Sequence, residues 1–330
     1  MNIENANRIL VIRFSSLGDI LLTTPFLRVL QKKAPTARID YLVKAIFIDA
    51  VKLNPNLHEI FAWQTKEELE KVVVELKSKK YDFVIDLQNN FRSKRVVSRL
   101  GIDSFAFKKP NLKKFLLVQL KLNLLKDKTP IPKKYIEVVP ELEMDNFGLE
   151  LFLPENIKIE IESKKNVIGL APGAFHYTKR WPIEYYAELG DMLKKDGFEI
   201  VIFGGKSDRE ICNKLGKKIE GSRDLSNDNQ LFSTAADMKK CKLIVCNDSG
   251  LMHTATSVGV PVVSIFGSTV KEFGFAPFGV KSLIIENNNL SCRPCTHIGK
   301  ATCSKKHFKC MVELSAEMVH KEIKKFMRKI

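Results

Sequence analysis

The residues best suited to bind an anion form the stretch Asn247-Asp248-Ser249-Gly250, which joins an apolar run at 243–246 to a segment with helical character. A helix starting here would direct unpaired backbone N–H groups at a phosphate, and Gly250 would let that ligand approach the backbone closely. His253 falls one turn into the same helix, where it could contact the ligand or pack in the core. The alternative is that Asp248 or Ser249 merely caps the helix, which would stabilise the protein by about 1 kcal/mol.

A carboxylate and a lysine in two other loops meet the remaining needs of a transfer reaction. Asp19 follows Gly18 at a predicted turn between strand and helix, where it could take a proton from an attacking hydroxyl. Lys179 lies in a loop at 171–180 that also contains Gly173, and its mobile ammonium could hold the charge of a leaving diphosphate. Each residue also has an alternative explanation without a role in catalysis. Asp19 could be present because the helix dipole favours an acid in the first turn, and Lys179 could be a solvated loop residue.

Further polar residues are candidates for binding roles. Asp208, or else Glu210, follows a Gly204-Gly205 loop and could accept a ribose hydroxyl. Arg92, in a polar loop at 88–93, could hold an acceptor phosphate or carboxylate through its guanidinium, with a surface ion pair as the alternative. A carboxylate beside phosphates is unfavourable because the two negative charges repel each other. It is tolerated where the carboxylate caps N–H groups or binds ribose, or where a metal lies between the charges. We therefore expect Asp248 to be a positioning residue.

The seven cysteines include a cluster, Cys292-x2-Cys295-x7-Cys303-x6-Cys310, with His297 and His307 among its members. This spacing can form a tetrahedral structural zinc site. The alternative is reduced thiols without metal, since disulfides rarely persist in the cytoplasm. The sequence thus makes structural zinc a candidate, and no cofactor is expected for catalysis itself.

Alternating apolar runs and helical patterns predict parallel, doubly wound sheets. In the first half we expect strands at 9–14, 39–43 and 82–87 and helices at 19–31 and 67–79, and a second alternation starts at 166. We therefore predict an α/β fold with two Rossmann-like domains, residues 1–155 and 156–330, facing each other across a cleft. Ligands bind such sheets at the carboxyl ends of strands, which places the loops at 15–19 and 88–93 among the site elements. The terminal helix, 315–330, is expected to pack across the domain junction.

The composition is that of an ordinary globular protein, with 330 residues, 45% hydrophobic and 28% charged. No apolar run approaches the roughly 18 residues of a membrane span, and the polar start of the chain does not resemble a signal peptide, which favours the cytoplasm. The formal charge of +16 indicates an acidic partner.

Residues 108–134 hold nine lysines and one acid, Asp127, among apolar residues. This segment could lie on an anionic membrane, or it could be a solvated helix packed on its own domain.

Four stretches resemble the family 9 glycosyltransferases, the bacterial heptosyltransferases that build the inner core of lipopolysaccharide. They are Ile12-Arg13-Phe14-Ser15-Ser16-Leu17-Gly18-Asp19-Ile20, Asp86-Leu87-Gln88-Asn89-Asn90-Phe91-Arg92-Ser93, Pro172-Gly173-Ala174 with Lys179-Arg180-Trp181-Pro182, and Asn247-Asp248-Ser249-Gly250-Leu251-Met252-His253. Their order and spacing match the family over nearly the whole chain. The resemblance is closest to the heptosyltransferase II branch, in which a comparable cysteine-rich segment occurs.

The resemblance implies a GT-B fold, with the nucleotide-diphosphate sugar bound mainly by the second domain, and an inverting transfer of heptose from ADP-heptose to a lipid-linked core oligosaccharide. It makes Asp19 the catalytic base and Lys179 the phosphate-binding lysine, and it places the 247–253 stretch in the donor site. Ser16, Gly18 and Arg92 are assigned to the acceptor, and Gly173 and Asp208 to the donor. Such an enzyme would be cytoplasmic and could be peripheral on the inner membrane.

Two alternatives stay open at this point. One is the transfer of another sugar from a nucleotide donor. The other is a basic nucleic-acid-binding protein, but no signature of such binding accompanies the charge, so no nucleic-acid partner is expected. A dinucleotide oxidoreductase is disfavoured because neither half has Gly-x-Gly-x-x-Gly after its first strand.

Overall fold

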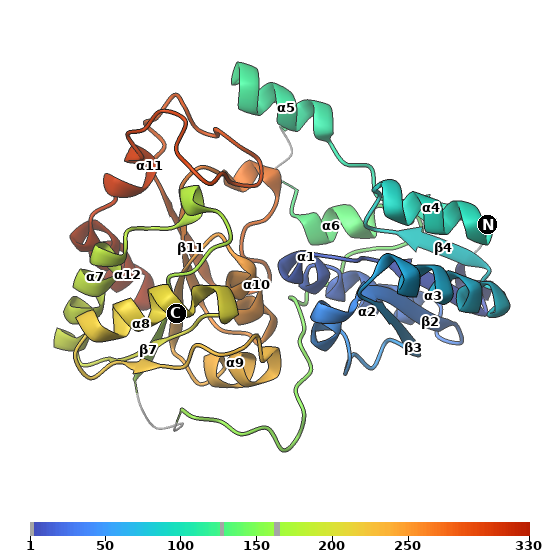
Figure 1. Cartoon of the computed structure of the whole chain (residues 1–330), viewed down its shortest axis with the longest axis horizontal. Helices are drawn as coiled ribbons and strands as arrows, with labels where there is room; N and C mark the ends of the chain where they lie inside the picture. The colour runs from blue at the N-terminus through green and yellow to red at the C-terminus, as the bar shows by residue number, and fades with distance from the viewer. Residues whose placement is uncertain (1–2, 126–128, 162–165) are drawn as a thin grey trace. The chain divides into compact units, whose positions relative to one another are not determined.

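The chain folds into two compact α/β units. The computed structural model describes residues 3–125, 129–161 and 166–330. The first unit comprises residues 1–110 and 129–152, and the second comprises residues 111–128 and 153–330. Figure 1 colours the chain along its length and labels the elements named below.

The first unit is a parallel sheet of five strands in the order β3-β2-β1-β4-β5. Its strands are β1 (Arg8–Ile12), β2 (Arg38–Lys44), β3 (Glu59–Trp63), β4 (Phe83–Asp86) and β5 (Ser104–Ala106). Its helices are α1 (Leu17–Leu21), α2 (Thr24–Lys33), α3 (Lys66–Ser78), α4 (Phe91–Leu100) and α6 (Ile131–Ile136), with 3₁₀ turns at Ile3–Asn5 and Ala45–Ala50. Four consecutive residues of β1, from Ile9 to Ile12, are fully buried, as expected for a parallel strand covered on both faces.

The second unit is a parallel sheet of six strands in the order β11-β10-β9-β6-β7-β8. Its strands are β6 (Val167–Ala171), β7 (Glu199–Ile202), β8 (Arg223–Asp224), β9 (Leu243–Asn247), β10 (Val262–Phe266) and β11 (Ser282–Glu286). Its helices are α5 (Asn111–Leu120), α7 (Ile183–Lys195), α8 (Arg209–Lys218), α9 (Leu231–Met238), α10 (Gly250–Ser257), α11 (Lys309–Val312) and α12 (Ala316–Met327), with 3₁₀ turns at Tyr177–Lys179, Lys206–Asp208 and Lys271–Phe273.

Both sheets have the strand order of a Rossmann fold, and each has one point where that order reverses. The reversal lies between β1 and β4 in the first unit and between β6 and β9 in the second. Loops that leave such a pair of strands separate to opposite faces of the sheet, and the space between them at the carboxyl ends is where ligands bind. This topology selects the loops after β1, β4, β6 and β9 as the site elements.

The predicted helix at 19–31 is instead two helices, α1 and α2, with Leu22 and Thr23 between them. Pro25 lies in the first turn of α2, where a residue without an N–H group is tolerated, whereas in the middle of one long helix it would remove a hydrogen bond. The predicted loop at 88–93 is shorter than expected because α4 already begins at Phe91, with Asn90 as its cap.

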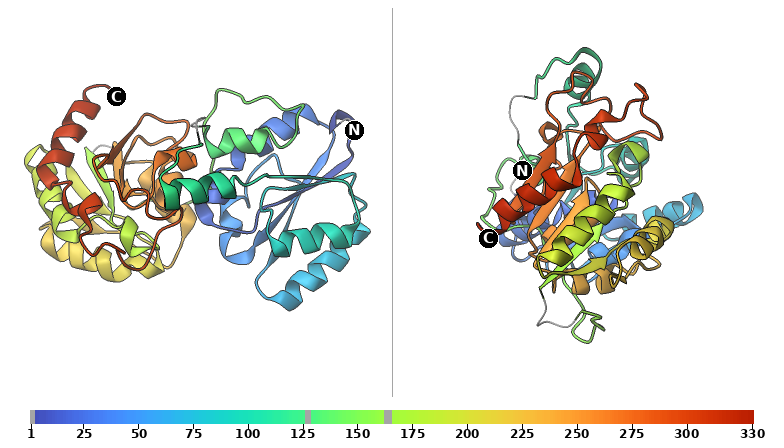
Figure 2. Two further views of the ribbon diagram at one scale, coloured as in Figure 1. Left: turned by 90° about the horizontal axis from the view of Figure 1, so that it is seen from above. Right: turned by 90° about the vertical axis from the view of Figure 1, so that its left-hand side faces the viewer.

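The C-terminal helix α12 packs against α7 of the second unit, as Figure 2 shows. Val319 and Ile323 are fully buried in a cluster that includes Leu193 of α7. His320 and Lys324 also contact Asp196, the residue after α7, at 2.7 and 3.0 Å. These contacts join the helix to the second unit, and its packing across the domain junction stays a prediction.

Helix α5, in the middle of the lysine-rich segment, groups with the second unit, although the sequence assigned residues 1–155 to one domain. Leu117 and Leu125 form a small core with Phe273. Lys126 and Asp127 lie outside the described residues. No helix in the described part of the chain is both long and apolar enough to cross a membrane.

A glycine in β6 provides a test of how tightly the second sheet is packed. A Cβ atom on Gly169 would lie 2.4 Å from Ile244 Cδ1 and 2.6 Å from Phe203 Cε2. We expect Gly169→Ala to lower the free energy of unfolding by about 1–3 kcal/mol because the core must shift to admit the methyl group. Gly216→Ala in α8 is the control, since its nearest neighbours would be 3.8 Å away and alanine favours a helix by roughly 0.5–1 kcal/mol. Denaturant unfolding of both variants measures the difference, and equal stabilities would contradict the packing argument.

Candidate active site

The loop after β1 holds Asp19 in a fixed position in the first turn of α1. Asp19 Oδ2 accepts hydrogen bonds from the Ser16 backbone N–H at 3.1 Å and from Ser16 Oγ at 2.7 Å. Asp19 Oδ1 forms an ion pair with Arg13 Nη2 at 2.6 Å. Ser16 is exposed and Gly18 is buried. The structure therefore brings Asp19 and Ser16 together, and both oxygens of the carboxylate are engaged.

Arg13 is the partner that the sequence did not identify as a site residue. Its guanidinium also donates to the carbonyls of Ser15 at 3.0 Å and Leu87 at 2.7 Å. Burial acts to lower the pKa of this guanidinium, but Asp19 and the nearby Tyr135 and Tyr41 outweigh burial and leave that pKa raised. Arg13 thus remains charged, and it links the Asp19 loop to the loop after β4.

The loop after β4 is held by a buried carboxylate and a buried amide. Asp86 accepts hydrogen bonds from the Gln88 and Asn89 backbone N–H groups and from Ser93 Oγ, and burial raises its pKa in spite of these bonds. Gln88 Oε1 in turn accepts from the backbone N–H groups of Phe14 and Ser15, at 3.0 and 3.3 Å. The two loops at the reversal point of the first sheet are therefore tied together.

Two basic residues lie near this pair of loops. Burial, followed by the charge of Arg13, lowers the pKa of Lys109, which is close enough to Asp19 and Asp86 to sense both carboxylates. No motif in the sequence singles out Lys109. Arg92, predicted to bind the acceptor, is exposed in the first turn of α4 and lines a pocket of about 370 Å³.

In the second unit, the loop after β6 is fixed by Asn247, the last residue of β9. Asn247 Oδ1 accepts from the Trp181 backbone N–H at 3.1 Å, and its Nδ2 donates to the Pro172 carbonyl at 2.8 Å. Arg180 Nε also donates to the Ala174 carbonyl at 2.7 Å. These bonds hold the backbone of the loop that carries Gly173 and Lys179.

Lys179 and Asp248, both predicted to be donor-site residues, meet directly. Lys179 Nζ lies 2.7 Å from Asp248 Oδ2, and their side chains are 15% and 9% exposed. Thr269 Oγ1 donates to the same carboxylate oxygen at 2.7 Å. Asp248 is thus paired with a cation and a hydroxyl in the described structure, and its role as a positioning residue stays a prediction.

The first turn of α10 carries donors suited to an anion. Ser249 precedes the helix in an extended conformation, with φ of −146°, and its side chain does not cap the helix. Its buried Oγ has no hydrogen-bond partner in the described part of the chain. A hydroxyl without a partner, beside free helix N–H groups and a lysine, can satisfy phosphate oxygens. His253 is 4% exposed within the same helix, which is the burial expected of the packing alternative.

Gly173 and Asp208 also lie together, at the carboxyl ends of β6 and β7. A Cβ atom on Gly173 would be 2.3 Å from the Asp208 carboxyl carbon, so only glycine admits that carboxylate. Asp208 accepts a hydrogen bond from the Gly205 N–H at 3.2 Å, and burial raises its pKa. Glu210, the alternative candidate, is 81% exposed and pairs with Lys214 in α8.

Three of the four clustered cysteines lie in the loop before α11 and Cys310 lies in α11 itself, and their sulfurs are not arranged as a metal site. Sulfur ligands of one tetrahedral zinc ion lie about 4 Å apart. Among the described residues, no three of these sulfurs lie within 4.8 Å of one another, and Cys292 Sγ is instead 3.9 Å from His307 Nε2. Burial raises the pKa of Cys310 to about 12, which favours its thiol form. The cysteines in this arrangement do not fit a zinc ion.

An arginine holds this loop to the donor side of the sheet. Arg293 donates to the carbonyls of Gly267 and Thr269, at 2.6 and 3.0 Å. It also forms a buried ion pair with Glu286 at 2.8 Å, and the two side chains are only 4% and 5% exposed. Because Thr269 contacts Asp248, the cysteine-rich loop supports the candidate donor site.

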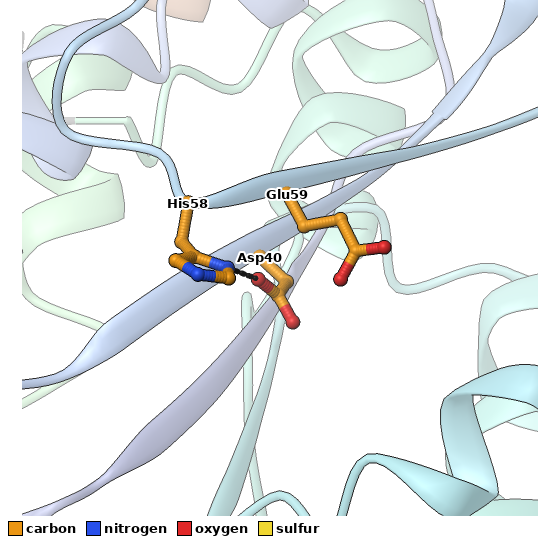
Figure 3. A group of neighbouring side chains, drawn as sticks. All are labelled: Asp40, His58 and Glu59. Carbon is orange, nitrogen blue, oxygen red and sulfur yellow. Dashed lines mark ion pairs between the residues drawn. The ribbon is translucent and has the colours of Figure 1, made fainter.

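One group of potential metal ligands is found within the described residues, namely Asp40, His58 and Glu59, shown in Figure 3. It lies at the amino ends of β1 to β3, away from the carboxyl edge. Arg8 already pairs with Asp40 at 2.7 Å and with Glu59 at 2.9 Å, and Lys79 pairs with Glu59 at 3.0 Å. Cations of the protein thus neutralise both carboxylates, and we interpret the group as an ion network that joins three strands.

The model of glycosyltransferase family 9 (heptosyltransferase) matches residues 69–307, well over half of the chain. The chain belongs to this family. Lipopolysaccharide heptosyltransferase 2 of Escherichia coli K12 is 28% identical over 294 residues, which cover 81% of this chain and 84% of that relative.

Two solved structures show the same fold. A family 9 glycosyltransferase of Veillonella parvula has a TM-score of 0.81 at 24% identity and covers 100% of this chain and 99% of its own. ADP-heptose LPS heptosyltransferase II of E. coli has a TM-score of 0.74 at 26% identity and covers 98% and 99%. The predicted GT-B class, with two Rossmann-like units, and the predicted glycosyltransferase activity are both confirmed.

Proposed function

We propose that this family 9 glycosyltransferase transfers a heptose from ADP-heptose to the inner-core oligosaccharide of lipopolysaccharide, with inversion at the anomeric carbon. The observation that carries the proposal is Lys179 paired with Asp248 at the N-terminus of α10, in a chain similar to heptosyltransferase 2 over 81% of its length. A lysine and free helix N–H groups at the carboxyl edge of a Rossmann sheet are the groups that a sugar diphosphate requires.

The donor diphosphate would bind in the second unit by exchange of ion partners. Its oxygens accept from Ser249 Oγ and from the first N–H groups of α10, while Lys179 moves its charge from Asp248 to the phosphates. Asp248 keeps its hydrogen bond from Thr269. Asp208, at the end of β7 beside Gly173, would accept a ribose hydroxyl.

The acceptor would bind in the first unit, with Asp19 as the base. The Ser16 hydroxyl, 2.7 Å from Asp19 Oδ2, shows that a hydroxyl group can donate to this oxygen. An acceptor hydroxyl in an equivalent position would be oriented for proton transfer. Arg13 fixes the opposite oxygen, so it is a positioning residue in this scheme.

The reaction is a single displacement. The acceptor oxygen forms a bond to the anomeric carbon of the heptose while the bond from that carbon to the diphosphate oxygen breaks. The acceptor proton passes to Asp19, and the electron pair of the broken bond leaves with ADP, whose added negative charge Lys179 and the α10 amides stabilise. No metal or other cofactor is required to balance these steps.

The proposal is tested by incubating the purified protein with a panel of nucleotide sugars and following its melting temperature. We expect ADP-heptose to raise the melting temperature more than ADP-glucose or UDP-glucose, because a ligand that binds the folded state stabilises it. Transfer of heptose to a heptose-free core acceptor is the second measurement. Transfer from another nucleotide sugar, with none from ADP-heptose, would overturn the assignment of the donor.

Asp19→Asn isolates the role of the base. The amide keeps the size of the side chain but cannot take the acceptor proton, so we expect turnover to fall by at least about 100-fold. Donor affinity should stay within a few-fold of wild type, since the diphosphate binds in the other unit. Near wild-type turnover in this variant would show that the base lies elsewhere.

Lys179→Ala should weaken donor binding and slow transfer together, because the lysine holds charge in both the ground state and the transition state. We expect the dissociation constant for ADP to rise by about tenfold or more, as for the loss of a charge-assisted bond. Lys239→Ala, which removes an exposed lysine just after α9, is the control for the change in net charge. An unchanged ADP affinity in Lys179→Ala would place this lysine outside the donor site.

We further propose that the protein is cytoplasmic and adsorbs to the inner membrane, where its lipid-linked acceptor lies, through α5 and the residues that follow it. Leu112, Phe115 and Leu120 are 70%, 58% and 59% exposed, and Lys113 beside them is also exposed. Such residues can enter the interface of an anionic bilayer, where each lysine adds about 1 kcal/mol.

Two other lysines of this segment have structural contacts instead. Lys114 lies over the rings of Phe273 and Phe275, at 6.0 and 5.5 Å from their centroids. Lys121 donates to the carbonyls of Cys292 and Pro294, at 3.1 and 2.7 Å. Substituting Lys121 would disturb the cysteine-rich loop and substituting Lys114 would remove its contacts with two aromatic rings, so the exposed apolar residues are the better targets for a test.

Co-sedimentation with vesicles measures this adsorption. We expect the wild type to bind anionic vesicles at low salt, and to bind less at high salt or to neutral vesicles. The triple variant Leu112→Gln, Phe115→Gln and Leu120→Gln should lose most of this binding. Val74→Gln, which changes a 71% exposed residue of α3, is the control. Equal binding by the triple variant and the wild type would contradict adsorption through α5 and would favour the alternative that α5 is a solvated helix.

A structural zinc ion at Cys292, Cys295, Cys303 and Cys310 stays a hypothesis. It would require the sulfurs to move closer together than they lie here. Elemental analysis of the purified protein decides between this ion and four reduced thiols.

A further inference from the structure

An aromatic ring in the core of the first unit lies against Arg13, the residue that fixes Asp19. The guanidinium carbon of Arg13 lies over the Tyr135 ring, 5.7 Å from its centroid. Arg13 is 6% exposed and Tyr135 is 1% exposed, so water has little access to either group. The attraction between a cation and an aromatic face is stronger when both are desolvated. This contact is therefore a candidate support for the position of the base.

The guanidinium of Arg13 is held within its own plane by three oxygen atoms. Nε donates to the Ser15 carbonyl, Nη1 donates to the Leu87 carbonyl, and Nη2 pairs with Asp19 Oδ1. The N–H groups of a guanidinium all point along its plane, so these bonds resist sliding within the plane more than tilting out of it. A ring packed over the face of the group opposes that tilt. The Tyr135 ring thus restricts the motion that the hydrogen bonds restrict least.

Tyr135 is itself held by its neighbours. It belongs to α6, and its ring meets the Phe107 ring edge-on, with centroids 5.0 Å apart and planes at 79°. The backbone of Phe107 is tied to the loop after β4, because its N–H donates to the Asp86 carbonyl at 2.9 Å and its carbonyl accepts from Asn89 Nδ2 at 2.8 Å. Helix α6 also packs on α2 of the same unit. The ring cannot move away from Arg13 without disturbing these contacts.

Tyr135 contacts Arg13 as a neutral ring. Burial raises the pKa of the Tyr135 hydroxyl well above the ordinary value for tyrosine. Tyr41, a second buried tyrosine whose charge would act on Arg13, shares a hydrogen bond of 3.0 Å with Thr23 Oγ1, and burial raises its pKa in the same direction. At neutral pH the surroundings of Arg13 therefore contain two uncharged tyrosines, and the ring of Tyr135 is the one that the guanidinium covers.

We infer that Tyr135 is a positioning residue for the transfer reaction, whose ring holds Arg13 so that Asp19 keeps Oδ1 on Arg13 and directs Oδ2 at the acceptor hydroxyl. The inference rests on the proposed function for the role of Asp19 as the base. In this scheme Tyr135 acts through Arg13 and does not contact the substrate. A displacement of reacting groups by about 1 Å can lower a rate by about 100-fold, so a ring one contact behind the ion pair can still affect turnover.

Two substitutions separate the ring of Tyr135 from its hydroxyl. Tyr135→Phe keeps the ring, so we expect kcat to stay within about twofold of wild type, whereas Tyr135→Leu removes the ring and should lower kcat by about tenfold or more. The KM for ADP-heptose should be unchanged in both variants, since the diphosphate is assigned to the second unit. Equal losses of kcat in the two variants would show that the hydroxyl matters instead of the ring and would contradict the inference.

Tyr81→Leu is the matched control. Tyr81 is also a buried tyrosine of the first unit, and Arg8 lies over its ring, 5.5 Å from the centroid. It lies at the amino ends of the strands and donates to Asp40, away from the candidate base. We expect this variant to lose stability, as Tyr135→Leu does, but to keep kcat within about twofold of wild type. Equal losses of kcat in both variants would show a general effect of a cavity in the core and would contradict a positioning role.

Rotation of the Arg13 guanidinium about its Nε–Cζ bond, measured by NMR of arginine-labelled protein, tests the contact without the reaction. We expect this rotation to be at least about tenfold faster in Tyr135→Leu than in the wild type and unchanged in Tyr135→Phe. The Arg8 guanidinium is the internal reference, because its contact with Tyr81 is intact in both variants.

The two measurements separate a failure of this inference from a failure of the proposed function. If the wild type transfers no heptose, the proposed function fails, and the NMR comparison still decides whether the ring restrains Arg13. If transfer is normal in Tyr135→Leu, only the role of Tyr135 is wrong. If that variant loses kcat while the rotation of Arg13 is unchanged, Tyr135 does not act through Arg13, and the inference is again wrong.

Discussion

A buried side-chain amide at the reversal point of each sheet holds the candidate site loops in place. In the first unit Gln88, after β4, accepts two backbone N–H groups from the loop after β1. In the second unit Asn247, at the end of β9, bonds on both sides to the loop after β6. A parallel sheet leaves the backbone groups of these loops without ladder partners, and a buried amide can satisfy a donor and an acceptor at once. The loops that carry Asp19 and Lys179 depend on these two residues.

Each candidate catalytic charge is already paired inside its own unit. Asp19 contacts Arg13, and Lys179 contacts Asp248, with none of the four side chains more than 20% exposed. Charges buried to this extent are costly without a partner, so each pair offsets the desolvation of its two members. Ligand binding is then an exchange of partners, in which the incoming anion or hydroxyl replaces a contact within the protein. Such an exchange favours substrates that provide full charge or good hydrogen bonds.

The sequence predicted the elements that have long apolar runs and missed those whose pattern is short. Strands β1, β2, β4 and β9 were expected close to their observed bounds, whereas β8 has only two residues, both exposed. The edge strands β3, β5 and β11 have mixed burial and no clear alternation. In the site, the sequence could select Asp19, Lys179 and Asp248 from their loops and from the family resemblance. It could not reveal Arg13 or Lys109, because their roles arise from contacts between loops far apart in the chain.

The placement of α5 has a consequence for how the protein is made. The chain leaves the first unit at residue 110, contributes α5 to the second unit, and returns at residue 129 before it leaves for good at 152. Helix α5 therefore emerges from the ribosome long before Phe273, against which Leu117 and Leu125 pack. Until that partner is synthesised, these leucines are exposed on an unfinished chain, a state in which apolar surface promotes aggregation. The lysines around them give the nascent segment a charge that keeps copies apart. Because each unit is built from two separate stretches of the chain, no single truncation point divides the protein into two complete units.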